Sequence, residues 1–140
     1  MLDAIAHRGP DGRGTTFFPQ ACLGHVRLAI IDIAGGGQPM RSGDGRYWIS
    51  YNGELYNYRE LRADLQRQGM EFQSGSDTEV ILAAFAHQGS DCLNSFRGMF
   101  AFALWDEQRQ EGYLVRDRFG IKPLFYATLG KQIVFGSEIK

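Results

Sequence analysis

Hydrophobic residues are spaced along the chain in a way that predicts strands near both ends. Toward the N-terminus, residues 14–18 and 21–31 have the apolar pattern of two strands joined at a turn. Four short apolar segments predict further strands in the second half, at 100–105, 113–115, 124–126 and 133–135. The segment 100–105 is apolar on both faces, so we expect the sheet that contains it to be covered on both sides.

Helical spacing appears between these two groups of strands. Residues 58–68 form an amphipathic pattern that ends at Gly69, and residues 80–85 form an apolar run. Ser76 and Glu79 precede that run with the spacing of a capping box. Strands at both ends with helices between them predict one α+β domain, in which two sheets pack together and helices lie outside.

The tyrosine-rich stretch before the first helix allows two interpretations. Residues 47–50 predict a strand that leads into Asn52 and Gly53, a dipeptide typical of turns. One interpretation is a plain turn from strand to helix. The other is functional: the Asn52 amide and the Gly53 N–H would together form an oxyanion hole, with Glu54 beside them to accept from an ammonium group.

Two further polar residues lie within apolar patterns. Arg27 interrupts the second strand and requires an anionic partner, either Asp32 or Glu54 within the chain or the carboxylate of a ligand. Asp77 lies in the first turn of the second helix, where a capping carboxylate is common. Combined with the Asn–Gly pair, these groups match the carboxylate, ammonium and carbonyl oxygen of a free α-amino acid.

Composition excludes several classes of function. The 140 residues are 44% hydrophobic and 22% charged with a net charge of −1, so neither nucleic acid nor an anionic membrane is an implied partner. The apolar runs are shorter than a membrane span, and no signal-peptide pattern is present. Cys22 and Cys92 form neither a disulfide framework nor a zinc site, and we expect both to be buried free thiols in a cytoplasmic protein.

Six motifs together resemble the class II glutamine amidotransferase domain, and in particular that of glutamine-hydrolysing asparagine synthetases. They are HRGPDG at 7–12, LGHVRLAIID at 23–32, YNGELYN at 51–57, SDTEVI at 76–81, RGMFAFA at 97–103 and RDRFGIKPL at 116–124. The resemblance extends over essentially the whole chain. It implies a four-layer αββα sandwich of two mostly antiparallel sheets, of the N-terminal-nucleophile hydrolase type, lacking its first strand.

The resemblance also implies roles for individual residues. Arg27 would hold the α-carboxylate of glutamine, and Asn52 with Gly53 would form the oxyanion hole. Glu54 and Asp77 would hold the α-ammonium group. The backbone that follows Arg27 would line the site, through Leu28, Ala29, Ile30 and Ile31.

The nucleophile of this family is a cysteine at the mature N-terminus, whose own α-amine acts as the base. This chain begins with Met1, and neither of its cysteines can take that position. We therefore expect residues 1–140 alone not to hydrolyse glutamine, as either a truncated or a naturally degenerate domain. Absence of the first strand would uncover a sheet edge and an apolar face, so we also expect association, for example into a homodimer.

The function implied is that of a glutaminase domain, which releases ammonia for ATP-dependent amidation of aspartate or a related carboxylate. Its partners would be glutamine and a C-terminal synthetase domain, and ATP and magnesium would bind only in that second domain. No metal or cofactor is expected in this one. The alternative is a non-catalytic module that binds glutamine or a partner protein through a degenerate site. His7 and His25 have no catalytic role in the family and are interpreted as structural.

Overall fold

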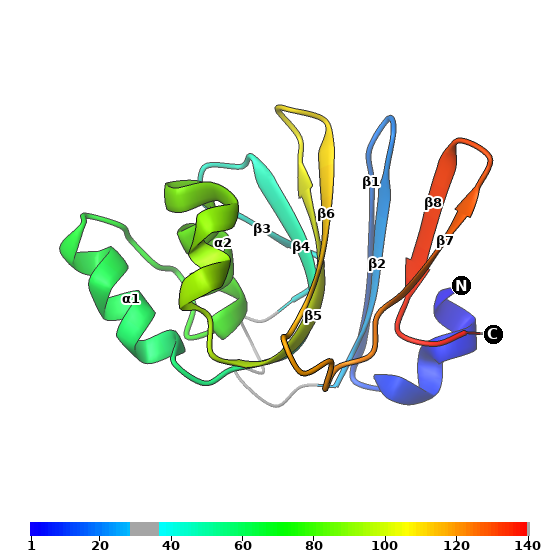
Figure 1. Cartoon of the computed structure of the whole chain (residues 1–140), viewed down its shortest axis with the longest axis horizontal. Coiled ribbons are helices and arrows are strands. Elements are labelled where there is room, and N and C mark those ends of the chain that lie inside the picture. Colours follow the sequence, from blue (N-terminus) through cyan, green and yellow to red (C-terminus); the bar gives the residue numbers. More distant parts are fainter. Residues whose placement is uncertain (29–36, 140) are drawn as a thin grey trace.

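The computed structural model describes residues 1–28 and 37–139. Its elements follow the order η1 (Leu2–Arg8), β1 (Gly12–Phe17), β2 (Cys22–Arg27), β3 (Met40–Arg41), β4 (Tyr47–Leu55), α1 (Tyr58–Arg67), α2 (Asp77–Gln88), η2 (Gly89–Ser95), β5 (Gly98–Asp106), β6 (Glu111–Arg116), β7 (Phe125–Leu129) and β8 (Gln132–Gly136). The elements are arranged in layers (Figure 1), with α1 and α2 on one face of the sheet β3–β4–β5–β6. The β1–β2 hairpin covers its other face, and all named strand pairs are antiparallel.

The centre of the molecule is the pairing of β4 with β5, which extends over nine residue pairs, from Tyr47 opposite Asp106 to Leu55 opposite Gly98. Alternate residues of these strands face opposite layers. The helix side buries Tyr47, Ile49, Tyr51, Leu55, Phe100, Phe102 and Leu104. On the other side, Ala103 and Trp105 pack against Leu23 of β2. β5 is therefore covered on both faces, as its apolar sequence predicted.

The predicted helices are present, but the capping box is only half formed. Ser76 precedes α2 and accepts from the Thr78 N–H at 3.2 Å. Glu79 does not reach back to Ser76; it accepts from the backbone N–H groups of Gln73 and Ser74, both at 2.8 Å. The carboxylate thus stabilises the loop that leads into the helix.

The predicted turn at Asn52–Gly53 is wrong. Both residues lie inside β4, which continues to Leu55 before the chain turns at Tyr56 and Asn57. Glycine is required here by the neighbouring strand, since a Cβ atom at Gly53 would lie 2.2 Å from the carbonyl oxygen of Met99. The dipeptide therefore marks a close approach of two backbones and not a change of direction.

The two cysteines differ in environment. Cys92 is fully buried, and burial raises the pKa of its thiol to about 12. Cys22 is exposed, contrary to the expectation, because it begins β2 opposite Phe17, which is itself 78% exposed.

Candidate active site

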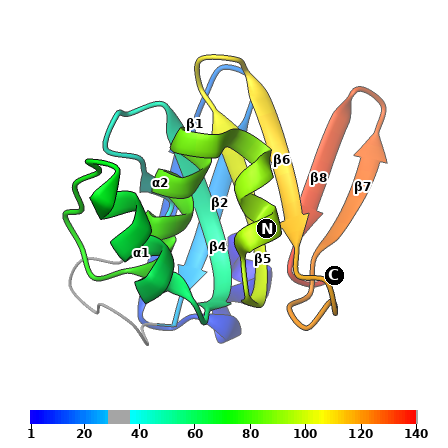
Figure 2. The same cartoon turned by 60° about the vertical axis from the view of Figure 1, so that its left-hand side comes forward.

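Two strands from different sheets end at the same end of the molecule. β2 ends at Arg27 and β4 ends at Leu55, and both strand ends lie at the lower edge of Figure 2. Asp77, the first residue of α2, contacts the end of β4 through a hydrogen bond from the Leu55 N–H. Residues far apart in sequence are thereby gathered at one edge of the sheets.

Arg27 and Asn52 lie on facing surfaces of the two sheets. On β2, alternation places Arg27 on the same face as Leu23, which packs against β5. On β4, Asn52 pairs with Ala101 and shares the β2-facing side of the sheet. Both side chains are half-buried. The proposed carboxylate clamp and one proposed oxyanion donor therefore face the same interlayer space.

The turn that precedes β1 holds the backbone of Arg27 in place. The Arg27 carbonyl accepts from the Asp11 N–H at 3.0 Å. Gly9 approaches so closely that a Cβ atom there would lie 2.4 Å from the Arg27 nitrogen. The strand end that carries the guanidinium is thus fixed by the first of the six motifs.

The Gly53 N–H points out of the edge of β4 that faces away from β5. Phe100, the partner of Gly53, directs its own N–H and C=O to Asp117 on its other side, so Gly53 and Phe100 form a non-hydrogen-bonded pair. The neighbouring edge N–H groups are capped by side chains: Tyr51 N–H by the Gln38 Oε1 at 2.6 Å, and Leu55 N–H by the Asp77 Oδ2 at 3.0 Å. The Gly53 N–H lies between these two capped groups and is directed the same way.

Asp77 is buried on the helix side of β4. It is 4% exposed, and its Oδ2 also accepts from the Tyr51 hydroxyl at 2.8 Å. Burial and the Asp77 charge raise the pKa of Tyr51 above its ordinary value, so the hydroxyl remains a donor. Glu54 is exposed and points to the opposite face. The two proposed ammonium ligands therefore do not share one surface.

The remaining predicted lining residues are only partly described. Leu28 follows β2 and is 57% exposed. Ala29, Ile30 and Ile31 lie outside the described residues, as does Asp32, one of the alternative partners of Arg27.

Gln38 was not among the predicted site residues, although it contacts the edge of β4. Besides capping Tyr51, its amide nitrogen lies 3.5 Å from the Thr78 hydroxyl oxygen at the start of α2. Gln38 therefore links the edge of β4 to the helix that carries Asp77. No periodic signal could have identified it, because its role depends on contacts with two distant elements.

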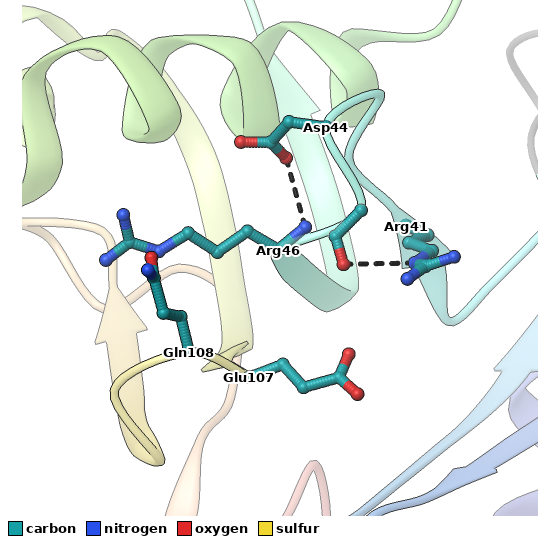
Figure 3. A pocket seen from close by; sticks show the side chains of 6 residues that line it. Arg41, Asp44, Arg46, Glu107 and Gln108 are labelled. Atoms are coloured by element: carbon teal, nitrogen blue, oxygen red, sulfur yellow. Dashed lines mark hydrogen bonds between the residues drawn. The ribbon is translucent and has the colours of Figure 1, made fainter.

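A shallow cleft of about 490 Å³ lies at the opposite end of β4, where that strand begins (Figure 3). It is lined by Arg41, Asp44, Gly45, Arg46, Glu107 and Gln108. Its polar groups bond to one another: the Arg41 Nε donates to the Gly45 carbonyl at 3.1 Å, and the Arg46 N–H donates to Asp44 at 3.1 Å. The cleft contains none of the predicted site residues.

Across residues 1–28 and 37–139, no cluster of three or more histidine, cysteine or acidic side chains is arranged to hold a metal ion. In the same part of the chain, no helix has the length and apolar character needed to cross a membrane.

Relatives and solved structures are similar to this chain over most of its length. Asparagine synthetase [glutamine-hydrolyzing] 1 of Bacillus subtilis is 46% identical over 140 residues, which is all of this chain but 22% of the relative. Amidase chry2 of Gibberella zeae is 44% identical over 142 residues, covering 99% of this chain and 21% of that protein. The chain thus spans about a fifth of the length of these relatives.

Among solved structures, the glutamine phosphoribosylpyrophosphate amidotransferase from B. subtilis, complexed with ADP and GMP, superposes with a TM-score of 0.78. It is 26% identical, and the match covers 97% of this chain and 37% of that one. The expected α+β fold of the N-terminal-nucleophile hydrolase type is confirmed. A sequence profile described as a glutamine amidotransferase domain matches residues 1–140, and the chain belongs to that family.

Proposed function

We propose that this domain binds glutamine and releases ammonia from its side-chain amide, within a longer protein that uses the ammonia to amidate aspartate or a related carboxylate. The observation that carries the proposal is the Gly53 N–H, directed out of the β4 edge between two capped neighbours. The similarity to glutamine-hydrolysing asparagine synthetases supports the same substrate.

Each described residue has a defined task in this reaction. Arg27 holds the α-carboxylate in a two-pronged contact, which orients the side-chain amide beforehand. A thiolate attacks the amide carbon, and the resulting oxyanion accepts from the Gly53 N–H and the Asn52 amide. Ammonia leaves with a proton returned by the base, and water then hydrolyses the thioester to glutamate. Either Glu54 or Asp77 is the candidate for contact with the α-ammonium group, because the two lie on opposite faces of β4.

The attacking thiolate cannot be Cys92, because that thiol is fully buried in the helix-side core and its raised pKa keeps it protonated. Following the family resemblance, we assign the nucleophile to an N-terminal cysteine outside residues 1–140. ATP and magnesium would act in a separate synthetase domain of the same protein. A cytoplasmic location fits the two free cysteines.

The test is Arg27→Lys in the full-length protein that carries this domain. Loss of the two-pronged geometry removes roughly 1.5–3 kcal/mol of charged hydrogen bonding, which raises the apparent glutamine constant about ten- to a hundredfold. Ammonia-dependent synthesis should stay close to wild type, because free ammonia bypasses this site.

Two results would contradict the proposal. An equal loss of the glutamine-dependent and the ammonia-dependent activities would mean that Arg27 supports the fold and does not act specifically on glutamine. Glutamine binding by the wild type without any release of ammonia would instead support a non-catalytic binding module.

A further inference from the structure

A polar contact connects the two facing sheets close to the candidate site. The His25 Nδ1 on β2 lies 3.1 Å from the Ser50 hydroxyl oxygen on β4. The same hydroxyl donates to the Gly24 carbonyl at 3.2 Å. The surrounding packing is apolar, since Leu23, Ala103 and Trp105 form a buried cluster between these layers. A polar contact in such a place is costly to build unless every group in it is satisfied.

The directions of these hydrogen bonds show which ring nitrogen of His25 carries a proton. The Gly24 carbonyl can only accept, so the single hydroxyl hydrogen of Ser50 is directed to it. The Ser50 oxygen must then accept from His25, which places the imidazole proton on Nδ1. Burial and the nearby Arg27 charge lower the pKa of His25 to about 4, so the ring is neutral near pH 7.

On each strand, the residue of the His25–Ser50 contact lies two positions before a proposed site residue. His25 precedes Arg27 by two residues on the inner face of β2, and Ser50 precedes Asn52 by two residues on the facing side of β4. Two residues of strand correspond to about 6.6 Å, so the contact is the neighbouring step along both strands. A shift of one sheet against the other would therefore change the His25–Ser50 contact and the separation of Arg27 from Asn52 together.

We propose that the hydrogen bond from His25 to Ser50 is a positioning device for glutamine hydrolysis, which holds the carboxylate clamp on β2 at a fixed distance from the oxyanion donors on β4. The inference rests on the proposed function. His25 touches neither glutamine nor the reacting atoms, so it is a positioning residue and not a catalytic one.

This role predicts a particular kinetic signature. Arg27 alone can still bind the α-carboxylate when the sheets shift, so glutamine affinity should change little. The amide carbonyl would then miss its donors, and a misplacement of about 1 Å can cost about a hundredfold in rate. The loss should therefore appear in kcat for glutamine hydrolysis, while ammonia-dependent synthesis is spared.

Two substitutions of His25 separate positioning from mere filling of space. In His25→Asn the side-chain amide nitrogen takes the place of Nδ1 and can still donate to Ser50, whereas in His25→Gln it lies near the position of Nε2. In the full-length protein we expect His25→Asn to keep kcat within about threefold of wild type, and His25→Gln and Ser50→Ala to lower it about ten- to a hundredfold. The matched control is His87→Asn, at an exposed position in the last turn of α2, which should leave kcat unchanged.

The outcomes distinguish this inference from the proposed function. Equal losses in the Asn and Gln variants, or losses that follow the melting temperature and the ammonia-dependent activity, would show that His25 only supports the fold. Unchanged kcat in His25→Gln and Ser50→Ala would overturn the inference and leave the proposed function intact. A wild-type protein that carries its N-terminal cysteine and releases no ammonia from glutamine would overturn both.

Discussion

Asp77 accepts a hydrogen bond from the Tyr51 hydroxyl at 2.8 Å, with both groups buried between α2 and β4. The same carboxylate oxygen accepts from the Leu55 N–H, so one side chain binds the start of the helix to the end of the strand. A buried carboxylate of this kind depends on its donors, because an ionised oxygen without them is costly in an apolar layer.

Tyr51→Phe removes one of these donors and leaves the aromatic packing in place. We expect the free energy of unfolding to fall by about 1–3 kcal/mol, the cost of leaving a buried polar group unsatisfied. Urea unfolding followed by tryptophan fluorescence measures this change. The control is Tyr113→Phe. The Tyr113 hydroxyl donates to the exposed Glu111 at 3.1 Å, and its removal should lower the free energy of unfolding by less than about 0.5 kcal/mol. Equal effects in both variants would contradict a structural role for the Asp77 contact.

Gly53→Ala tests the close approach of β4 to β5. The added methyl group would lie 2.2 Å from the Met99 carbonyl oxygen. Because β4 and β5 are paired along their whole length, the two strands cannot easily move apart to make room for it. We expect a loss of about 1–3 kcal/mol in stability from overpacking, together with a loss of ammonia release as the Gly53 N–H moves. Gly112→Ala on β6 is the control, because its nearest contact would be the Trp105 ring at 3.6 Å. Thermal unfolding and glutaminase assays of both variants in the full-length protein decide the matter.

The regular elements could be predicted because their periodicity is local. β5 was expected from residues 100–105 and α1 from 58–68, and both are observed with small differences at their ends. The Asn52–Gly53 prediction failed because dipeptide preferences describe turns and contain no information on a neighbouring strand. Gly53 is determined by the Met99 carbonyl, 46 residues later in the chain. The prediction that Cys22 is buried was wrong for a related reason, since the exposed end of a hairpin can carry the same apolar pattern as its buried part.

The site was less predictable than the fold. Its proposed residues came mainly from the resemblance to amidotransferases, and local chemistry alone left Arg27 and Asp77 with ordinary structural alternatives. The structure adds what sequence spacing does not contain: Arg27 and Asn52 lie on the facing sides of two sheets, whereas Glu54 and Asp77 lie on opposite sides of β4. Contacts such as Gln38 with the Tyr51 N–H exist only after the layers have packed.

Asp117 offers a test of the turn that follows β6. Its carboxylate accepts from four backbone N–H groups, those of Phe100, Phe119, Ile121 and Lys122. Asparagine has one acceptor oxygen and would turn an NH₂ group toward some of these donors. We expect Asp117→Asn to cost about 2–5 kcal/mol in urea unfolding, against less than about 0.5 kcal/mol for the exposed Asp64→Asn.

The ionisation of Asp117 should also make the stability of the protein depend on pH in the acid range. Burial alone would raise the pKa of Asp117, but its four backbone donors outweigh burial and lower the pKa below its ordinary value. Its contribution to stability is therefore complete above about pH 4, the unfolded value, and is lost as the pH falls through the lower folded value. If the difference in free energy of unfolding between wild type and Asp117→Asn stayed constant down to pH 2, the lowered pKa of Asp117 would be contradicted.

His25 should give the protein a second and separate sensitivity to acid. The pKa of His25 in the folded state is about 4 and its ordinary value is 6.5, because burial and the Arg27 charge both oppose protonation. Between these two values the unfolded chain binds a proton that the folded chain does not. The free energy of unfolding should therefore be constant above about pH 6.5, and it should decrease as the pH falls toward 4.

The expected decrease is about 2 kcal/mol between pH 7 and pH 5, from the proton linkage of one group with these two pKa values. At pH 5 the carboxylates with lowered pKa values are still ionised, so this window isolates the imidazole. His25→Asn keeps the donor to Ser50 and cannot titrate, so its stability should be nearly equal at the two pH values. His87→Asn, at an exposed position on α2, is the matched control and should keep the wild-type difference in stability between the two pH values. Parallel stability curves for wild type and His25→Asn between pH 7 and pH 5 would show that His25 is protonated in the folded protein. The hydrogen-bond directions at Ser50 would remain the same, because a protonated imidazole also donates from Nδ1.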